Sequence, residues 1–567
     1  MRASFPPATE TPTSQSAYNL ALVTISFLSR HGRQPGLISR LGFGFLLAVS
    51  LIANCHAQPG ADSASAAGRG RILLVLPFDN RSGQPNLEWI REAAPDILGS
   101  RFLSAGFAPM SRTDRLYALD HLGLPAGFHP SRATALKLAQ TLDADSIVVG
   151  SFITDGSGII AEAQIVDVPH LRISKTISSR GEMKDLITVF DSLAWELTRQ
   201  LDPGFSVAEE TFVAAGQGTR LDAFEQYIRG ISESDHEERL RHLNQAVTLS
   251  PVFGSAWMAL GREDFNSQQY EQSAAAFAHA QGQVQGTDAL EAGFYLGVSL
   301  LFSGSYPRAE KAFAGVAQVL PLAEVVNNQG VAISRQGHDG TALFRQAVAA
   351  DANSPDFHFN LAVSLKRHGD IAGALNELAA CLKLRPNDSE AQAMQEDWKQ
   401  SAAHQPGEAK ADPLERIARN FDAAAFRQAA QMLDQVDEAR LAALSPEQRA
   451  QKLSAQARDY LDHGLLLEAE RLYQTALAAD DRVAEVHAGL AEIRERTGDV
   501  QNARKEAVTS LDLIPTVPAY LVVARLDLAA GHLDDASYHV EQALKIDANN
   551  HAALDLRQQI EVRKARK

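Results

Sequence analysis

SPDFHFNLAVSLKRHGDIAGALNELAACLKLRP, residues Ser354–Pro386, decides the fold because it holds one complete helix-turn-helix unit. Apolar residues recur at helical spacing on both sides of His368-Gly369, where glycine can adopt the left-handed conformation that ends a helix. Ala362 and Ala374 are expected to face each other across the hairpin, because a larger side chain at either position would push the two helices apart. The stretch therefore predicts a tightly packed pair of antiparallel helices.

The spacing of small, large and turn residues in this unit resembles the tetratricopeptide repeat, which has a period of about 34 residues. His358 stands where that family has tryptophan. The resemblance implies a superhelical solenoid in which the first helices of successive units line a concave groove for an extended peptide or a partner's helix. The positions that carry it are Leu361, Ala362, Leu365, Gly369, Ala374, Leu378, Cys381 and Pro386.

Degenerate copies of the unit occur on both sides of it and predict an all-α solenoid with an interruption. A first array is expected over 221–386 and a second over 414–550, separated by a linker or an irregular helix over 387–413. The polar helix over 551–567 suits a terminal cap, which a solenoid needs for solubility. A linker over 204–220 precedes the first array.

A different pattern over 71–203 predicts an α/β domain with a mixed sheet and packed helices. Continuous apolar runs at 72–78 and 146–152 are typical of strands buried on both faces of a sheet. A turn is expected at 79–83. Pro95 suits the first turn of a helix through Asp96–Ala105.

Three short stretches of this domain resemble the amino-terminal domain of TolB and the related FlgO and CsgG families of the cell envelope. They are Val75-Leu76-Pro77-Phe78-Asp79-Asn80 with Ser82-Gly83, then Ala144–Ser151, and Ala163–Asp167. The resemblance implies a non-enzymatic module associated with the envelope. No propeller follows, so the role of TolB itself does not carry over.

The first 57 residues have the order of a secretory signal peptide. Arg40 precedes the apolar run 41–53, and Cys55-His56-Ala57 offers small residues for cleavage after Ala57. Residues 58–70 are small and polar and predict a flexible linker. Export to the periplasm is the expected outcome. The alternatives are an uncleaved anchor, or an outer-membrane lipoprotein lipidated at Cys55; contact with a membrane is expected only if Cys55 is lipidated.

The charge balance argues against nucleic acid as a partner. The chain has 69 acidic and 53 basic residues, a formal charge of −16, which repels phosphate backbones. Its cysteines are Cys55 and Cys381, so a chain cleaved after Ala57 could form no internal disulfide. Cys381 is expected to be a small core residue of a repeat helix.

Polar residues on the first helices of the repeats are the candidate partner-binding groove, although each has the plain alternative of an ordinary solvated side chain. The basic members favour an acidic or carboxylate-bearing partner segment. The candidates are Arg262, Asn266, Asn327, Arg335, Lys366 and Arg367.

No catalytic, cofactor or metal site is predicted. The sequence contains no HExxH, GxSxG, GxxxxGK[ST] or CxxC motif. The function expected is a non-enzymatic scaffold or adaptor of the bacterial cell envelope that binds proteins or peptide segments of unknown identity. The alternatives are an assembly or secretion-system accessory factor of the outer membrane, and a regulatory TolB-like repeat protein.

Overall fold

The computed structural model describes residues 72–216, 218–403 and 413–566, which divide into two compact units. Unit 1 comprises the described residues of 251–433, and unit 2 comprises those of 72–250 and 434–566. The predicted leader over 1–57, including Cys55, and the predicted linker over 58–70 lie outside the described residues. No helix in the described part of the chain is long and apolar enough to cross a membrane.

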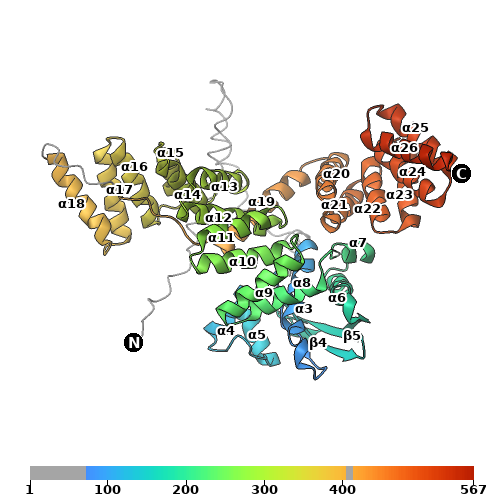
Figure 1. The fold of residues 1–567 in the computed structure, drawn as a ribbon, viewed down its shortest axis with the longest axis horizontal. Coiled ribbons are helices and arrows are strands. Elements are labelled where there is room, and N and C mark those ends of the chain that lie inside the picture. Colours follow the sequence, from blue (N-terminus) through green and yellow to red (C-terminus); the bar gives the residue numbers. More distant parts are fainter. Residues whose placement is uncertain (1–71, 217, 404–412, 567) are drawn as a thin grey trace, which may run out of the picture. The chain divides into compact units, whose positions relative to one another are not determined.

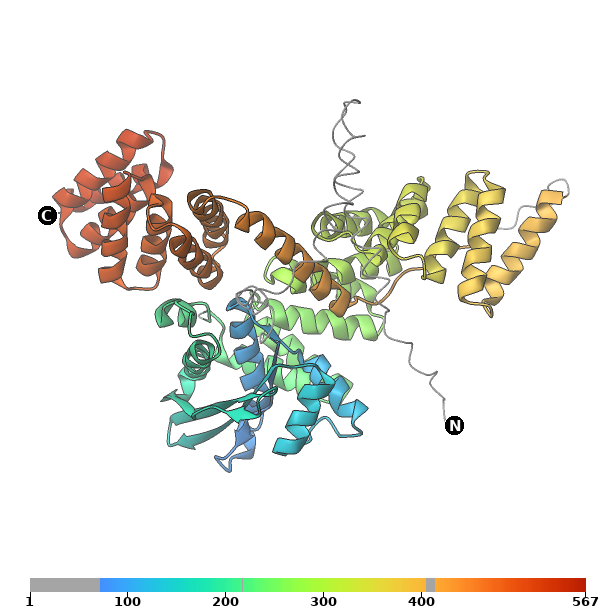
Figure 2. The same ribbon diagram turned by 180° about the vertical axis from the view of Figure 1, so that it is seen from behind.

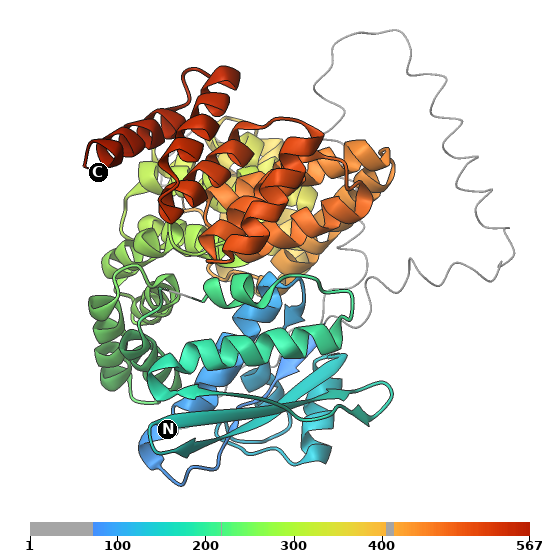
Figure 3. The ribbon, with the colours of Figure 1, turned by 90° about the vertical axis from the view of Figure 1, so that its right-hand side faces the viewer.

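Unit 2 contains the α/β domain, which is built on a mixed sheet of seven strands, two of them off the main path (Figure 3). The first strand lies between two parallel neighbours, and the long fourth and fifth strands form an antiparallel hairpin that turns at Gly156. The strands are β1 (Ile72–Val75), β2 (Asp79–Asn80), β3 (Ala108–Pro109), β4 (Ser146–Asp155), β5 (Gly158–Asp167), β6 (Arg172–Ile173) and β7 (Ile177–Glu182).

Helices cover the sheet as the apolar strands require. The longest, α6 (Leu186–Leu201), packs on β5, β7 and α3 (Ile90–Ser104), and its Phe190 ring lies 5.6 Å from the Phe78 ring. Ser111 caps α4 (Arg112–His121), and Ser131 caps α5 (Arg132–Thr141). The predicted α/β class is therefore confirmed.

Two local predictions in this domain are wrong. The first strand ends at Val75, and Asp79-Asn80, expected in a turn, pairs with Ser151-Phe152 as β2. Helix α3 begins at Ile90 rather than near Asp96, so that Pro95 lies inside it. Pro95 has no N–H to donate to the Arg91 carbonyl, and that carbonyl instead accepts a hydrogen bond from the Phe78 amide at 3.1 Å.

The predicted linker over 204–220 contains a short helix, α7 (Glu209–Ala214). It packs on α6 and on α21 (Leu466–Ala479) of the same unit. The Ala208 amide donates to Glu470 at 3.1 Å, and Arg494 donates to Thr211 at 3.0 Å. Glu470 is fully buried and also accepts from Arg494 at 2.8 Å, so Arg494 and the Ala208 amide supply the partners that its charge needs. Together these bonds order the segment.

The remaining helices of unit 2 are two-helix hairpins and a closing helix. The last, α26 (His551–Ala565), lies where a capping helix was predicted. The others are α8 (Leu221–Ser232), α9 (His236–Leu249), α20 (Pro446–Asp462), α22 (Ala484–Arg496), α23 (Val500–Leu513), α24 (Val517–Ala530) and α25 (Leu533–Ile546).

Unit 1 is a run of two-helix hairpins that follow one another in chain order (Figure 1). Gly369, with φ of +83°, lies in the turn between the helices of the organising hairpin. The helices are α10 (Gly254–Asn266), α11 (Tyr270–Gln281), α12 (Gly286–Phe302), α13 (Tyr306–Val319), α14 (Ala323–Arg335), α15 (Thr341–Ala350), α16 (Pro355–Arg367), α17 (Ile371–Leu384) and α18 (Ser389–Ala403). The predicted solenoid is confirmed.

Near the predicted boundary between the arrays, the structure differs from the sequence interpretation. The stretch 387–413, expected to be a linker or an irregular helix, contains the regular helix α18. The expected second array over 414–550 begins instead with an extended stretch, and its first helix is α19 (Ala423–Ala442). That extended stretch packs against earlier helices of its own unit.

His358 makes the same kind of main-chain hydrogen bond as Trp257 of an earlier hairpin. Trp257 donates through Nε1 to the Pro251 carbonyl, six residues earlier, at 2.9 Å. His358 Nε2 makes the equivalent bond to the Ala352 carbonyl at 3.0 Å, while its Nδ1 bonds to Glu377 at 2.6 Å. The bond to Glu377 raises the pKa of His358, since both ring nitrogens face acceptors and an imidazolium satisfies both.

Replacing Ala374 with tryptophan is expected to destabilise unit 1 by roughly 1–3 kcal/mol or more. Ala374 is fully buried in the α16–α17 hairpin, where an indole would overpack the core. Thermal melting followed by helical circular dichroism would show a lower midpoint. Ala372→Trp on the exposed side of the same helix is the matched control, and an unchanged melt for both variants would contradict the register of the hairpin.

Candidate partner-binding site

An extended segment of the chain itself lies against the first helices of the unit 1 hairpins. We call this segment, Pro413–Asp422, the strap; it has no helix or strand structure. Its residues contact α16, then α14, then α12 and α10, so it crosses the hairpins in reverse chain order. Figure 2 shows this orange coil passing along the green and yellow helices. We call the surface formed by α10, α12, α14 and α16 the first-helix face.

Two asparagines hold the strap by its main chain. The side-chain amide of Asn360 accepts from the Arg416 N–H and donates to the Arg416 carbonyl, both at 2.7 Å. Asn328 makes the same two bonds to Ala418: it accepts from the Ala418 N–H at 2.9 Å and donates to the Ala418 carbonyl at 2.8 Å. Bonded residues two apart are typical of an extended chain whose alternate residues face one side. These contacts involve only peptide groups and therefore carry no sequence preference.

A third asparagine, Asn327, connects the other two. Its carbonyl oxygen accepts from Asn360 at 2.8 Å, and its amide nitrogen donates to Asn328 at 3.2 Å and to the Arg416 carbonyl at 3.3 Å. All three side chains are fully buried. A buried amide without partners would cost about 1–3 kcal/mol, so the strap supplies bonds that this row needs.

An anion pocket on the same face holds the Glu415 carboxylate, whose side chain is 1% exposed. It bonds to Ser334 and to Arg367, and Arg335 lies 3.7 Å away. Arg335 also donates to the Glu415 carbonyl at 2.9 Å, and Arg367 donates to the Pro413 carbonyl at 3.1 Å. Two guanidinium groups thus converge on one buried carboxylate.

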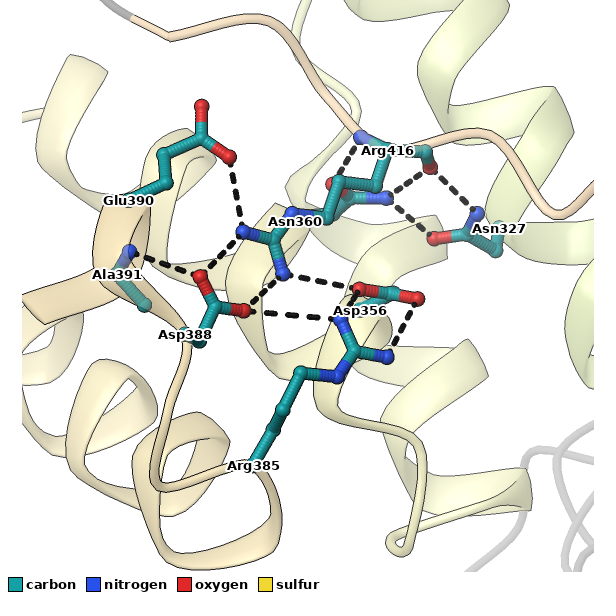
Figure 4. A network of polar contacts seen from close by, with 8 residues as sticks. All are labelled: Asn327, Asp356, Asn360, Arg385, Asp388, Glu390, Ala391 and Arg416. Atoms are coloured by element: carbon teal, nitrogen blue, oxygen red, sulfur yellow. Dashed lines mark hydrogen bonds and ion pairs between the residues drawn. The ribbon is translucent and has the colours of Figure 1, made fainter. Parts of the chain in front are cut away.

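Beside it, a cation pocket holds the Arg416 guanidinium (Figure 4). Asp388 binds both terminal nitrogens, at 2.6 and 2.9 Å, while Asp356 and Glu390 accept at 3.0 and 2.8 Å. The guanidinium carbon also lies 3.6 Å from the centre of the Phe359 ring. Bidentate pairing and stacking on an aromatic ring are both properties of arginine that lysine does not share.

The charge of Arg416 shifts the titration of this pocket. Its hydrogen bonds lower the pKa of Asp388 to about 2, from an ordinary 3.8. A carboxyl whose pKa is lower in the folded state contributes stability above about pH 4, and that contribution is lost as the pH falls toward 2. The pocket is therefore an acid-sensitive point of unit 1.

The far end of the strap meets aromatic side chains. Arg419 lies over the Phe302 ring at 5.0 Å and donates to the Tyr270 hydroxyl at 3.3 Å. The Phe421 amide donates to the Tyr295 hydroxyl at 3.4 Å. This end of the strap makes apolar and cation–π contacts, whereas its first half is held by hydrogen bonds and ion pairs.

Three of the six residues predicted from the sequence touch the strap: Asn327, Arg335 and Arg367. The other three have the following surroundings. Lys366 Nζ lies 5.9 Å from the Trp398 ring centre, Arg262 pairs with Glu291 at 2.7 Å, and Asn266 is exposed.

Sequence reasoning missed Asn328, Asn360, Ser334 and the acidic residues of the cation pocket. A signal for one of them was present, because Asn327 and Asn360 are 33 residues apart, one repeat period. An asparagine repeated at that spacing on the inner helix marks a main-chain contact. The acidic residues come from a helix start and from an interhelical loop, positions where no repeat pattern applies.

Comparison with known proteins places part of the chain in a repeat family. Residues 454–518 match the tetratricopeptide repeat model. No curated protein matches the sequence. Residues 454–518 therefore resemble tetratricopeptide repeats, which are typically non-enzymatic interaction modules with proteins or peptides as partners in general.

Solved structures similar to the chain include repeat proteins and one small domain. YrrB, a repeat protein described with an unusual peptide-binding site, is 16% identical over 31% of this chain and 92% of its own, with a TM-score of 0.29. MamA from Desulfovibrio magneticus is 20% identical over 30% and 100%, with a TM-score of 0.28. The LpoB C-terminal domain from Escherichia coli is 21% identical over 20% and 84%, with a TM-score of 0.18.

Proposed function

We propose that this tetratricopeptide repeat protein is a non-enzymatic scaffold of the bacterial cell envelope that binds an extended segment of a partner protein on the first-helix face of unit 1. One observation carries the proposal: Asn328 and Asn360 each hold both peptide groups of a strap residue. A surface that hydrogen-bonds to backbone N–H and carbonyl groups in this way can bind an extended peptide whatever its side chains. Side-chain pockets on either side then supply the selectivity.

The face suits binding for an energetic reason as well. Its asparagines and arginines project from helices that are already packed into the solenoid, so little ordering remains for the partner to induce. The cost of binding then falls mainly on the partner segment. The α/β domain, with its likeness to TolB, FlgO and CsgG, is proposed as a second contact.

The envelope location rests on the leader, with Arg40, the apolar run 41–53 and Cys55-His56-Ala57. Amino-terminal sequencing of the protein from its source cells tests it. A mature start at Gln58 supports periplasmic export, and a lipid-modified start at Cys55 supports an outer-membrane lipoprotein. An unprocessed cytoplasmic chain contradicts both. An assembly or secretion-system accessory role differs from a general scaffold only in the identity of the partner.

Capture of partners from an envelope extract tests the binding face. The strap-released variant, Glu415→Lys with Arg416→Glu, places like charges in both pockets and is expected to recover more partner than the parent. Adding Asn328→Ala and Asn360→Ala to it should abolish the gain, because the main-chain grip is then lost. Reversing the charge of Arg335 and Arg367 is a weaker test, since these residues also hold the strap.

The matched control for the released variant is Asp437→Lys with Arg440→Glu. This pair on α19 is exposed and lies outside the strap, and the two exchanges have the same effect on charge. It should behave as the parent. Equal partner recovery by the released variant with and without the asparagines would show that the first-helix face is not the binding surface.

A further inference from the structure

We propose that the strap is a built-in competitor for the first-helix face, and that the partner segment carries the strap's own pattern: an acidic residue, an arginine, an apolar residue and a small residue in sequence. This inference rests on the proposed function and adds the chemistry of the partner. In the strap these four positions are Glu415, Arg416, Ile417 and Ala418.

The anion pocket demands an acidic side chain at the first position. Arg335 and Arg367 converge there, with side chains 13% and 26% exposed. A neutral residue would leave two cations together in a poorly hydrated site, and a lysine would add a third. The Glu415 carboxylate accepts a hydrogen bond from Ser334, and this contact sets the side-chain length that the acidic residue needs.

The cation pocket demands arginine at the second position. Three carboxylates surround the guanidinium, and Asp388 binds two of its nitrogens at once. A planar guanidinium can make this pair while lying flat on Phe359, whereas an ammonium can make only part of it. Adjacent strap residues thus fill pockets of opposite charge, which also fixes the direction in which a segment binds.

The next two positions follow from packing. Ile417 is half-buried against the core of unit 1, so an apolar side chain fits there. Ala418 packs against a cluster that includes Ala323, Val326 and Phe357, and its N–H and carbonyl must both reach Asn328. Because the Ala418 side chain is itself half-buried against this cluster, a small side chain fits there.

Covalent attachment gives the strap its advantage as a competitor. A segment in the same chain as its site has a higher effective concentration at that site than a free segment in solution. A free segment of equal affinity therefore binds poorly until the strap is weakened. The face of the isolated protein is occupied, and a partner must displace the strap.

A labelled ten-residue peptide with the strap sequence PLERIARNFD tests this directly by fluorescence anisotropy with the full chain. The strap-released variant is expected to bind it at least tenfold more tightly than the parent or the Asp437→Lys, Arg440→Glu control. The peptide PLREIARNFD has the same composition with the two charges exchanged. Its binding to the released variant is expected to be at least tenfold weaker.

Each other outcome overturns the inference in a distinct way. No binding of PLERIARNFD by a released variant that keeps its helical circular dichroism would make the strap part of the fold rather than a ligand. Equal binding of the two peptides would contradict the proposed order of an acidic residue followed by an arginine. A concentration-dependent dimer of the parent, lost in the released variant, would identify a second copy as the occupant. If the envelope partners whose capture depends on the asparagines lack the four-residue pattern, that result would support the proposed function and refute this inference.

Discussion

Replacing Arg416 with alanine is expected to destabilise unit 1 by about 2–3 kcal/mol, because buried Asp388 loses its two short hydrogen bonds to the guanidinium and keeps only Arg385, 3.6 Å away, as a counter-ion. Asp388 has a side chain only 6% exposed, whereas Asp356 and Glu390 are exposed enough for water to compensate them. The main cost therefore comes from one carboxylate. Urea unfolding followed by tryptophan fluorescence would report it, since Trp398 is buried in the neighbouring helix α18.

Arg440→Ala is the control for this variant, because Arg440 pairs with Asp437 on an exposed surface, where ion pairs contribute about 0–1 kcal/mol. Arg416→Lys should fall between alanine and the parent, as it keeps the charge and loses the bidentate geometry. The difference between the parent and Arg416→Ala should shrink as the pH falls from about 4 toward 2, where Asp388 becomes protonated. A difference that is constant with pH would contradict this account.

Glu324→Gln is expected to stabilise unit 1 by about 3 kcal/mol at pH 8 and to have little effect at pH 4. Burial raises the pKa of Glu324 to about 7, from an ordinary 4.5, and the charges of Asp422 and Asp351 act in the same direction. A carboxyl with a raised pKa in the folded state costs stability as the pH climbs from about 4.5 through 7, because the charged form is disfavoured there. Glutamine removes the group that must ionise.

Urea unfolding of the parent and of Glu324→Gln between pH 4 and pH 8 measures this effect. Glu271→Gln, at an exposed position of α11, is the matched control and should change stability little at any pH. If the two glutamine variants showed the same pH profile, Glu324 would be ordinarily hydrated. Glu324 titrates at higher pH than Asp388, so one series of measurements across pH can separate the two effects on stability.

The sequence predicted those parts of the fold in which neighbours along the chain determine the structure. The hairpin of α16 and α17 follows from the helical spacing of its apolar residues, from Gly369 in the turn and from Ala374 in the contact. The buried strands β1 and β4 follow from continuous apolar runs. The same reasoning gave a wrong start for α3, because Pro95 lies inside the helix and the Phe78 amide, from outside the helix, bonds to the Arg91 carbonyl that Pro95 cannot reach.

About half of the candidate site could be predicted from the sequence, and the other half could not. Asn327, Arg335 and Arg367 were predicted because a repeat fixes which helix faces inward. Leu414–Asp422 was assigned to a second array, since nothing in its local pattern says that it lies against helices about 50 to 150 residues earlier in the chain. The tertiary structure decided that point. Its physical cause is the set of buried polar groups, three asparagines and two opposite charges, that find their partners only when the strap lies across them.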